Sequence, residues 1–342
     1  MSRSSLDQAS LLVLSLAAAT VTLTAGGCAT APNAPKVAIE RPQGIDSYVT
    51  GVRALNAGDE DSAIAGLRKA IAQNPNLRMA QKTLGELYMK RQQYADALPY
   101  LQRASELDPY TVSNHYNLGL SLQILHRLPE SIESYLRGLK IEPDDFKSNM
   151  NLGLVYFALN QLDPAVIYLE RSTRIDAKNP RGWSNLGVVH DARGNNVLAE
   201  ACYRRSLELE PDSEPTLLNL TSNLITQKKS TDAVDVAKQL VARKPDSAQA
   251  QKRLGDALTL AKDWDGALKA YDTSFGFDKN YLPAINGKAD MYLARYRAEL
   301  QLDESLRELA IATWKQSLAL NDKQPTVAEA VKKWSTASVD RH

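Results

Sequence analysis

Several kinds of residue pattern are scarce or absent in this 342-residue chain, and each absence excludes a class of function. Cysteine occurs only at Cys28 and Cys202, so at most one disulfide can form within the chain. The four histidines are scattered, and no cluster of His and Cys has the spacing of a metal site. Lys and Arg number 41 against 40 Asp and Glu, which leaves a net charge of +1 and no basic stripe. The sequence therefore predicts no metal ion and no nucleic-acid partner.

Catalytic signatures are missing as well. The chain contains no Gly-rich phosphate loop, no H-E-x-x-H and no G-x-S-x-G. His190 and Asp191 are adjacent, but neighbouring residues on a helix point about 100° apart, which does not suit an acid–base pair. We expect His190 and His115 to pack between helices and Cys202 to be an inert thiol. The sequence therefore predicts no enzyme and no cofactor.

A short apolar run lies near the N-terminus. Leu11–Ala25 carries no charged residue. It is shorter than the roughly 20 residues that a membrane-spanning helix needs, and it suits the hydrophobic segment of a secretory signal. The run leads into "TAGGCATAP", in which small residues precede Cys28. These features predict a signal peptide over residues 1–27 and a protein exported to the cell envelope.

The residues around Cys28 resemble the lipobox of bacterial lipoproteins, except that Ala25 stands where that family usually has Leu. The resemblance implies lipid on Cys28 and thus a membrane anchor. With Ala29 next in the chain, it also implies sorting to the periplasmic face of the outer membrane in a cell with two membranes. The Pro-rich residues 28–43 would form an extended tether. Two alternatives stay open: cleavage after Ala31 at an A-x-A site, and an incidental role for Cys28.

A period of 34 residues organises the rest of the chain. Small residues recur at position 8 of each period, and large apolar residues recur at positions 7 and 24. Position 20 is Ala or Ser, and position 32 is often Pro. The glycines at position 8 are Gly51, Gly85, Gly119, Gly153, Gly187 and Gly255. This pattern resembles the tetratricopeptide repeat over residues 44–322, with repeats starting near 44, 78, 112, 146, 180, 214, 248 and 282.

The resemblance implies an all-α protein, a right-handed superhelical solenoid of about eight helix hairpins. Small residues at positions 8 and 20 let two antiparallel helices, here named A and B, approach closely, and Pro at position 32 separates successive repeats. The pattern weakens in the last repeat, which has Lys288 and Ala289 at positions 7 and 8 and about nine extra residues. We expect a lengthened hairpin there. Within the cap and tail, residues 323–342, we expect a capping helix over Thr326–Trp334.

One face of helix A is left over once the hairpin is packed. Positions 2, 6, 9 and 13 lie about opposite the packing face. Position 6 is asparagine in four successive repeats: Asn117, Asn151, Asn185 and Asn219. The family resemblance implies that this face lines the concave, ligand-binding surface. Asparagine amides can pair with the backbone of a bound peptide, as in the similar repeats of the O-linked N-acetylglucosamine transferase. Alternatively, the four amides bond to neighbouring helices.

The residues around these asparagines are mostly apolar. We predict that Tyr116, Leu120, Met150, Leu154 and Phe157 join them in binding a partner, with the alternative that some are buried between repeats. A chaperone-type carboxylate clamp is incomplete. Lys82, Asn117 and Lys147 suit such a clamp, but Glu86 and Asn151 stand where it needs Asn and Arg. An extended or helical protein segment with apolar anchors is therefore the expected partner.

These features predict a protein–protein interaction scaffold. The architecture resembles the tetratricopeptide lipoproteins that assist assembly of pili, secretins or secretion complexes. Two other functions stay open: an adaptor that recruits cell-wall enzymes or proteases, and a regulatory subunit of a glycosyltransferase. The sequence does not indicate an oligomeric state.

Overall fold

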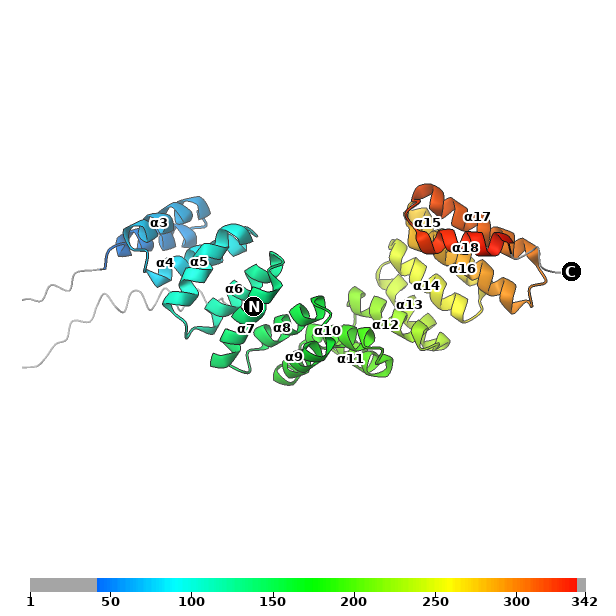
Figure 1. Ribbon diagram of the computed structural model, residues 1–342, viewed down its shortest axis with the longest axis horizontal. Coiled ribbons are helices and arrows are strands. Elements are labelled where there is room, and N and C mark those ends of the chain that lie inside the picture. Colours follow the sequence, from blue (N-terminus) through cyan, green and yellow to red (C-terminus); the bar gives the residue numbers. More distant parts are fainter. Residues whose placement is uncertain (1–41, 337–342) are drawn as a thin grey trace, which may run out of the picture. The chain divides into compact units, whose positions relative to one another are not determined.

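The computed structural model describes residues 42–336, in which seventeen α-helices and no strand occur (Figure 1). The predicted signal peptide, Cys28 and nearly all of the tether lie outside the described residues, as does the end of the tail. The helices are α2 (Ile45–Asn56), α3 (Glu60–Gln73), α4 (Arg78–Lys90), α5 (Tyr94–Leu107), α6 (Val112–Ile124), α7 (Leu128–Ile141), α8 (Phe146–Ala158), α9 (Leu162–Ile175), α10 (Pro180–Ala192), α11 (Asn196–Leu209), α12 (Glu214–Thr226), α13 (Ser230–Arg243), α14 (Ala248–Leu260), α15 (Trp264–Phe277), α16 (Leu282–Ala298), α17 (Glu304–Leu320) and α18 (Pro325–Thr336).

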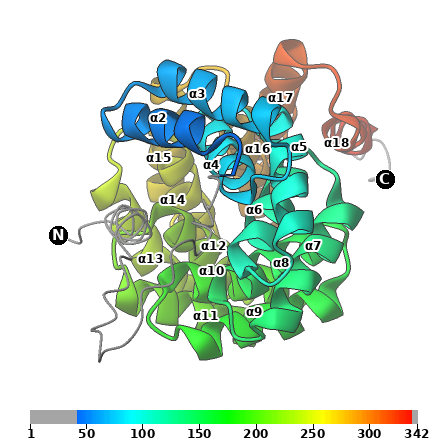
Figure 2. The same ribbon diagram turned by 90° about the vertical axis from the view of Figure 1, so that its left-hand side faces the viewer.

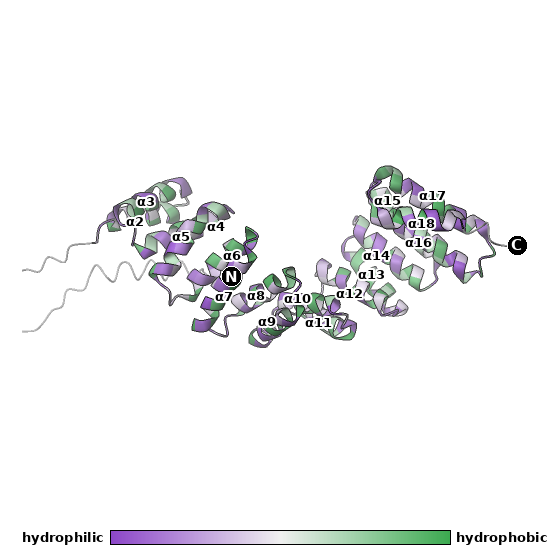
Figure 3. Cartoon of the chain, viewed as in Figure 1, coloured by the Kyte–Doolittle hydropathy of each residue, from purple (hydrophilic) through white to green (hydrophobic). Residues whose placement is uncertain are grey.

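The helices pair as hairpins, with an even-numbered helix A followed by an odd-numbered helix B. Hydrophobic and hydrophilic residues are mixed along each helix, as expected of helices that bury one face (Figure 3). Successive A helices from α4 to α16 also contact one another, whereas no successive B helices of the described array do so to a similar extent. Viewed along the array, the A helices lie on the inside and the B helices on the outside (Figure 2). The predicted superhelical solenoid of eight hairpins is confirmed.

The glycines at position 8 set the distance between A and B. A Cβ atom on Gly119 would lie 2.8 Å from the ring of Tyr135, and one on Gly187 would lie 2.6 Å from the ring of Tyr203. Real Cβ atoms do not approach other atoms so closely. Each glycine therefore leaves room for a large position-24 side chain of its own helix B. This contact fixes which face of helix A packs against helix B and which face points away from it.

Position 4 links each of four repeats to the one before it. A side-chain nitrogen at this position forms a hydrogen bond with the carbonyl oxygen six residues earlier, at position 32. The distance is 2.8 Å for Gln81, 2.9 Å for His115 and Asn149, and 3.0 Å for Trp183. The packing role predicted for His115 is confirmed, since the side chain is 3% exposed. The shared hydrogen bond was not predicted, because these four residue types look unrelated until the carbonyl that they all reach is known.

The C-terminal end departs from the period as expected. Helices α16 and α17 are 17 residues long each, against 12 to 14 for the helices before them. Val327 and Trp334 of α18 pack on a core formed by Leu293, Tyr296 and Trp314, so the predicted capping helix is confirmed. No helix in the described part of the chain is both long and apolar enough to cross a membrane.

Candidate protein-binding surface

The four aligned asparagines lie on α6, α8, α10 and α12, on the side that faces away from the B helices. We call this side of these helices the inner surface. It carries the residues predicted to bind a partner, and the structure shows which of their polar groups are already occupied. Whether they bind a partner stays a prediction.

Asn117 is hydrogen-bonded to the preceding repeat. Its Nδ2 donates a hydrogen bond of 3.0 Å to Oε1 of Glu86, which also lies 3.9 Å from Nζ of Lys82. Desolvation within the array raises the pKa of Glu86, although Asn117 and Lys82 both favour its charged form and its side chain is 42% exposed. Lys82 in turn donates a hydrogen bond of 3.1 Å to Ser113. The lysine that a carboxylate clamp would use is thus engaged within the array.

Asn151 is committed even more fully. Only 9% exposed, it donates from Nδ2 to the hydroxyl of Tyr116 at 3.3 Å and to the carbonyl oxygen of Lys147 at 3.1 Å. The Tyr116 ring also lies 5.8 Å from Nζ of Lys147. For these first two asparagines, the structure shows the arrangement that the sequence had left as an alternative, with each amide bonded inside the array.

Asn185 and Asn219 differ from the first pair. Both are half-buried, and neither side chain makes a hydrogen bond within the described residues. The register explains why. Asn117 reaches Glu86, which stands 31 residues earlier at position 9 of the preceding repeat. The corresponding residues for Asn185 and Asn219 are Leu154 and Val188, which offer no polar atom. Their amide groups are therefore available to a ligand.

The apolar residues predicted to bind a partner also fall into two groups. Tyr116, Met150 and Phe157 are half-buried and pack partly against core clusters of the array. Leu120 and Leu154 are half-buried as well but belong to none of these clusters. Ile124, at the end of α6, is 41% exposed. Leu120, Leu154 and Ile124 are thus the apolar side chains of the inner surface with most freedom to contact a partner.

Along the middle of the inner surface, charge occurs only at position 2, as Lys147 in α8 and Arg181 in α10. In α6, α8, α10 and α12, positions 6, 9 and 13 carry no charged residue. In α14 charges return: Asp256 accepts hydrogen bonds from Lys252 at 2.7 Å and from the hydroxyl of Tyr271 at 2.9 Å. A surface with so little charge suits a partner segment that contributes mainly apolar side chains and backbone polar groups.

His190 and Cys202, two side chains with possible chemical reactivity, are both buried. His190 is 6% exposed, and burial lowers the pKa of its imidazole. Cys202 is a free thiol that is 7% exposed, and burial raises its pKa to about 11. A thiol with so high a pKa is a poor nucleophile at neutral pH. No group of three or more His, Cys, Asp and Glu side chains within residues 42–336 has the geometry of a metal site.

Family comparisons agree with this geometry. Models of the tetratricopeptide repeat match residues 48–112, 146–179, 180–213 and 222–274, which together make up more than half of the chain. The chain belongs to the tetratricopeptide repeat family. It is accordingly a scaffold of the kind that mediates protein–protein interactions, built on a repeat that is generally non-catalytic.

Among solved structures, the fold is similar to the C-terminal part of a TPR repeat-containing protein from Cytophaga hutchinsonii. That protein is 17% identical with a TM-score of 0.58, over 70% of this chain and 98% of that one. It is also similar to Pseudomonas aeruginosa pilF, which is 19% identical with a TM-score of 0.54, over 62% of this chain and 97% of that one. YrrB, described as a TPR protein with an unusual peptide-binding site, is 18% identical with a TM-score of 0.50, over 55% and 97%. At these identities the likeness shows the fold alone.

Among curated proteins, Superkiller complex protein 3 of mouse is 34% identical over 85 residues, and the human protein is 32% identical over the same length. The aligned segment covers 25% of this chain and spans only 5% of the length of these relatives.

Proposed function

We propose that this scaffold holds a partner polypeptide on its inner surface, centred on α8, α10 and α12. The single observation that carries the proposal is the pair of half-buried, unbonded amides of Asn185 and Asn219, on helices whose positions 6, 9 and 13 carry no charge. An extended segment can give such amides a backbone carbonyl to donate to and an N–H to accept from. Leu120 and Leu154 would contact its apolar side chains.

The same proposal extends to the location of the protein. The apolar run before Cys28 and the Pro-rich residues after it support export and attachment to the envelope through lipid on Cys28. In that setting the scaffold would assist assembly of a pilus, a secretin or a secretion complex. The partner would be a subunit of that complex or its precursor.

Site-specific photo-crosslinking in cells tests the partner-binding surface. A photoreactive residue in place of Leu154 should give one dominant adduct, identified by mass spectrometry as a pilus, secretin or secretion subunit. The matched control replaces Lys238, an exposed residue of helix B α13, and should not give that adduct. Equal labelling of the same protein from both positions would contradict binding at the inner surface. An adduct with a cell-wall enzyme would contradict the assembly role but not the surface.

Labelling with radioactive palmitate tests the anchor separately. The wild-type chain should incorporate label and fractionate with envelope membranes, whereas Cys28→Ala should do neither. Absence of label from the wild-type chain, or equal label in Cys28→Ala, would exclude lipid attachment at this residue.

A further inference from the structure

The turn inside hairpin eight differs from the turns of the seven hairpins before it. In repeats one to seven, one residue at position 15 adopts a left-handed backbone conformation: Gly58, Gln92, His126, Asn160, Gly194, Lys228 and Lys262. In hairpin eight two consecutive residues do so, Leu300 with φ 56° and Gln301 with φ 61°. This region is unfavourable for a side chain such as leucine. A conformation of this kind is a reason to look for a function at the turn.

The same turn exposes apolar side chains next to negative charges. Leu300 is 79% exposed and Leu302 is 81% exposed. Residues 299–304 read "ELQLDE", which places three carboxylates and no basic residue around the two leucines. We call these six residues the acidic tip. Glu299 is paired with Arg295 at 2.8 Å, and an exposed pair of this kind contributes little and can exchange partners. Glu304 is held more firmly, by the buried Arg307 at 2.6 Å and by the hydroxyl of Tyr296 at 2.8 Å.

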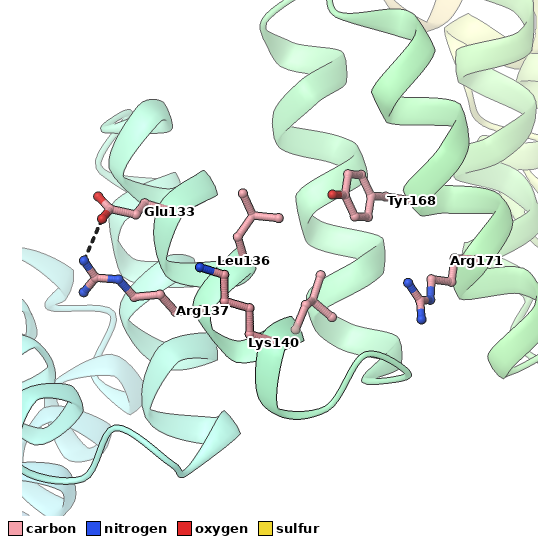
Figure 4. A pocket seen from close by; sticks show the side chains of 7 residues that line it. Glu133, Leu136, Arg137, Lys140, Tyr168 and Arg171 are labelled. Carbon is pink, nitrogen blue, oxygen red and sulfur yellow. Dashed lines mark hydrogen bonds and ion pairs between the residues drawn. The ribbon is translucent and has the colours of Figure 1, made fainter.

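The outer side of the array carries a hollow of complementary chemistry. Between helices B α7 and α9 lies a pocket of about 370 Å³, lined by Leu136, Leu139, Tyr168, Glu133, Arg137, Lys140 and Arg171 (Figure 4). The apolar side chains among these residues form part of the lining, and three cations stand around it. Lys140 is exposed and forms no ion pair within the described residues. We call this site the basic pocket.

The ion pairs around the basic pocket are also exposed. Arg137 lies 2.6 Å from Glu133 on its own helix, and Arg171 lies 3.1 Å from Asp144. A second hollow adjoins the pocket at Arg171 and includes Arg174 and Ile175. The basic pocket thus offers apolar area together with cations that are free or weakly paired. These are the groups that would receive a short acidic segment with leucine anchors.

We propose that the acidic tip of one copy of this chain binds the basic pocket of a second copy. Leu300 and Leu302 would contact Leu136 and Tyr168, and the carboxylates of Glu299 and Asp303 would pair with Lys140 and Arg137. Each contact joins two different surfaces, a tip and a pocket, so it is heterologous, and the joined pair keeps one free pocket on the first copy and one free tip on the second. Association of this kind continues beyond the dimer as concentration rises. It uses the turn between α16 and α17 and the outer helices α7 and α9, and it does not depend on the proposed role of the inner surface.

Sedimentation equilibrium of the purified chain tests this proposal, and mixing makes the test specific. The tip variant, Leu300→Asn with Leu302→Ser, introduces at position 300 the residue type that Asn160 provides in repeat four. The pocket variant, Arg137→Glu with Lys140→Glu, changes exposed side chains only. Each variant alone should associate at least tenfold more weakly than the wild-type chain. An equimolar mixture should form a one-to-one dimer, because the mixture retains one intact tip and one intact pocket.

Two controls accompany the mixture. Lys238→Glu with Lys269→Glu makes the same change in net charge on exposed positions of α13 and α15 and should associate like the wild-type chain. Raising the salt concentration from about 0.05 to 0.5 M should weaken wild-type association, because the pairs are exposed and screened. A wild-type chain that is monomeric throughout, or a mixture that stays monomeric, would overturn the proposal. Neither result would affect crosslinking at Leu154.

Discussion

Asn117 and Asn151 share a register with Asn185 and Asn219, yet the two pairs differ in their hydrogen bonding. In the first pair each amide is bonded within the array, to Glu86 for one and to Tyr116 and the Lys147 carbonyl for the other. In the second pair neither amide is bonded within the described residues. Repeat register thus decides which face an asparagine occupies, but the polar groups within reach of its amide decide whether that amide is free.

This difference changes what the repeated asparagine means. A run of four asparagines suggests four equal contacts with a ligand, whereas the structure divides them into structural and available groups. Position 9 one repeat earlier accounts for three of the four asparagines, since it is Glu before Asn117 and apolar before Asn185 and Asn219. The apolar residue before Asn151 would leave its amide free, but this amide donates a hydrogen bond to the hydroxyl of Tyr116 instead.

The largest expected effect tests the packing that holds all four asparagines in one register. Gly187→Ala should lower the free energy of unfolding by about 2–3 kcal/mol, because its Cβ would collide with the Tyr203 ring at 2.6 Å. Gly276→Ala is the matched control, since a Cβ there meets no atom within 4 Å. It should leave stability unchanged or raise it by up to about 1 kcal/mol. Urea denaturation measures the free energy of unfolding of both variants. An equal change in both would mean that helices A and B do not pack closely at Gly187.

A second prediction compares the two pairs of asparagines directly. Asn151→Ala should cost about 1–2 kcal/mol of unfolding free energy, because it removes a buried donor from the Tyr116 hydroxyl and the Lys147 carbonyl. Asn185→Ala should change it by less than about 0.5 kcal/mol, since no protein partner is lost. Chemical denaturation of both variants under the same conditions checks this. A similar loss in both would contradict the division into pairs.

A third prediction converts an available amide into an occupied one. Leu154→Glu places a carboxylate at the register position that Glu86 holds relative to Asn117. We expect Asn185 to donate to it, with a coupling energy of about 0.5–1.5 kcal/mol in a double-mutant cycle with Asn185→Ala. The variant should also lose affinity for the partner. A coupling energy of zero would show that register alone does not bring these two positions into contact.

The smallest effect concerns pH and the buried face of α10. Burial lowers the pKa of His190 below its unfolded value, so the folded state binds a proton less readily than the unfolded state. Stability is therefore fully present above the unfolded pKa of about 6.5 and falls as pH drops below it. Between pH 7 and pH 5 the wild-type chain should lose more stability than His190→Gln, by about 1 kcal/mol or less. Thermal melts at the two pH values measure this. Equal losses would mean that His190 takes up its proton without disturbing the core.

Most of the fold was predictable because it depends on the sizes of the side chains at a few repeat positions. Gly119 and its counterparts recur every 34 residues because each must leave room for Tyr135 or the equivalent residue of its own hairpin. The lengthened last hairpin and the cap also followed from the broken period. The link through Gln81, His115, Asn149 and Trp183 was missed because four chemically different side chains perform one function there.

For the candidate site, the sequence predicted which face of the A helices carries it but not which of its amides are free. Position 6 identifies the inner surface, but the bonding of an amide depends on a side chain one repeat away, and the bond of Asn151 to Tyr116 depends on details of geometry. The Glu86 bond of Asn117 could have been found by comparing position 6 with position 9 of the preceding repeat. The left-handed conformation of Leu300 leaves no comparable signal, because leucine is not a residue that favours it.

The central claim is that Asn185 and Asn219 are the amides that hold the partner. Its most direct test is the dissociation constant of the crosslinked partner, measured with two double variants of the chain. Asn185→Ala with Asn219→Ala should weaken binding at least tenfold while the free energy of unfolding stays within about 0.5 kcal/mol of wild type. Asn117→Ala with Asn151→Ala should do the reverse, lowering stability while the folded protein keeps its affinity. Wild-type affinity in the first variant would contradict the account.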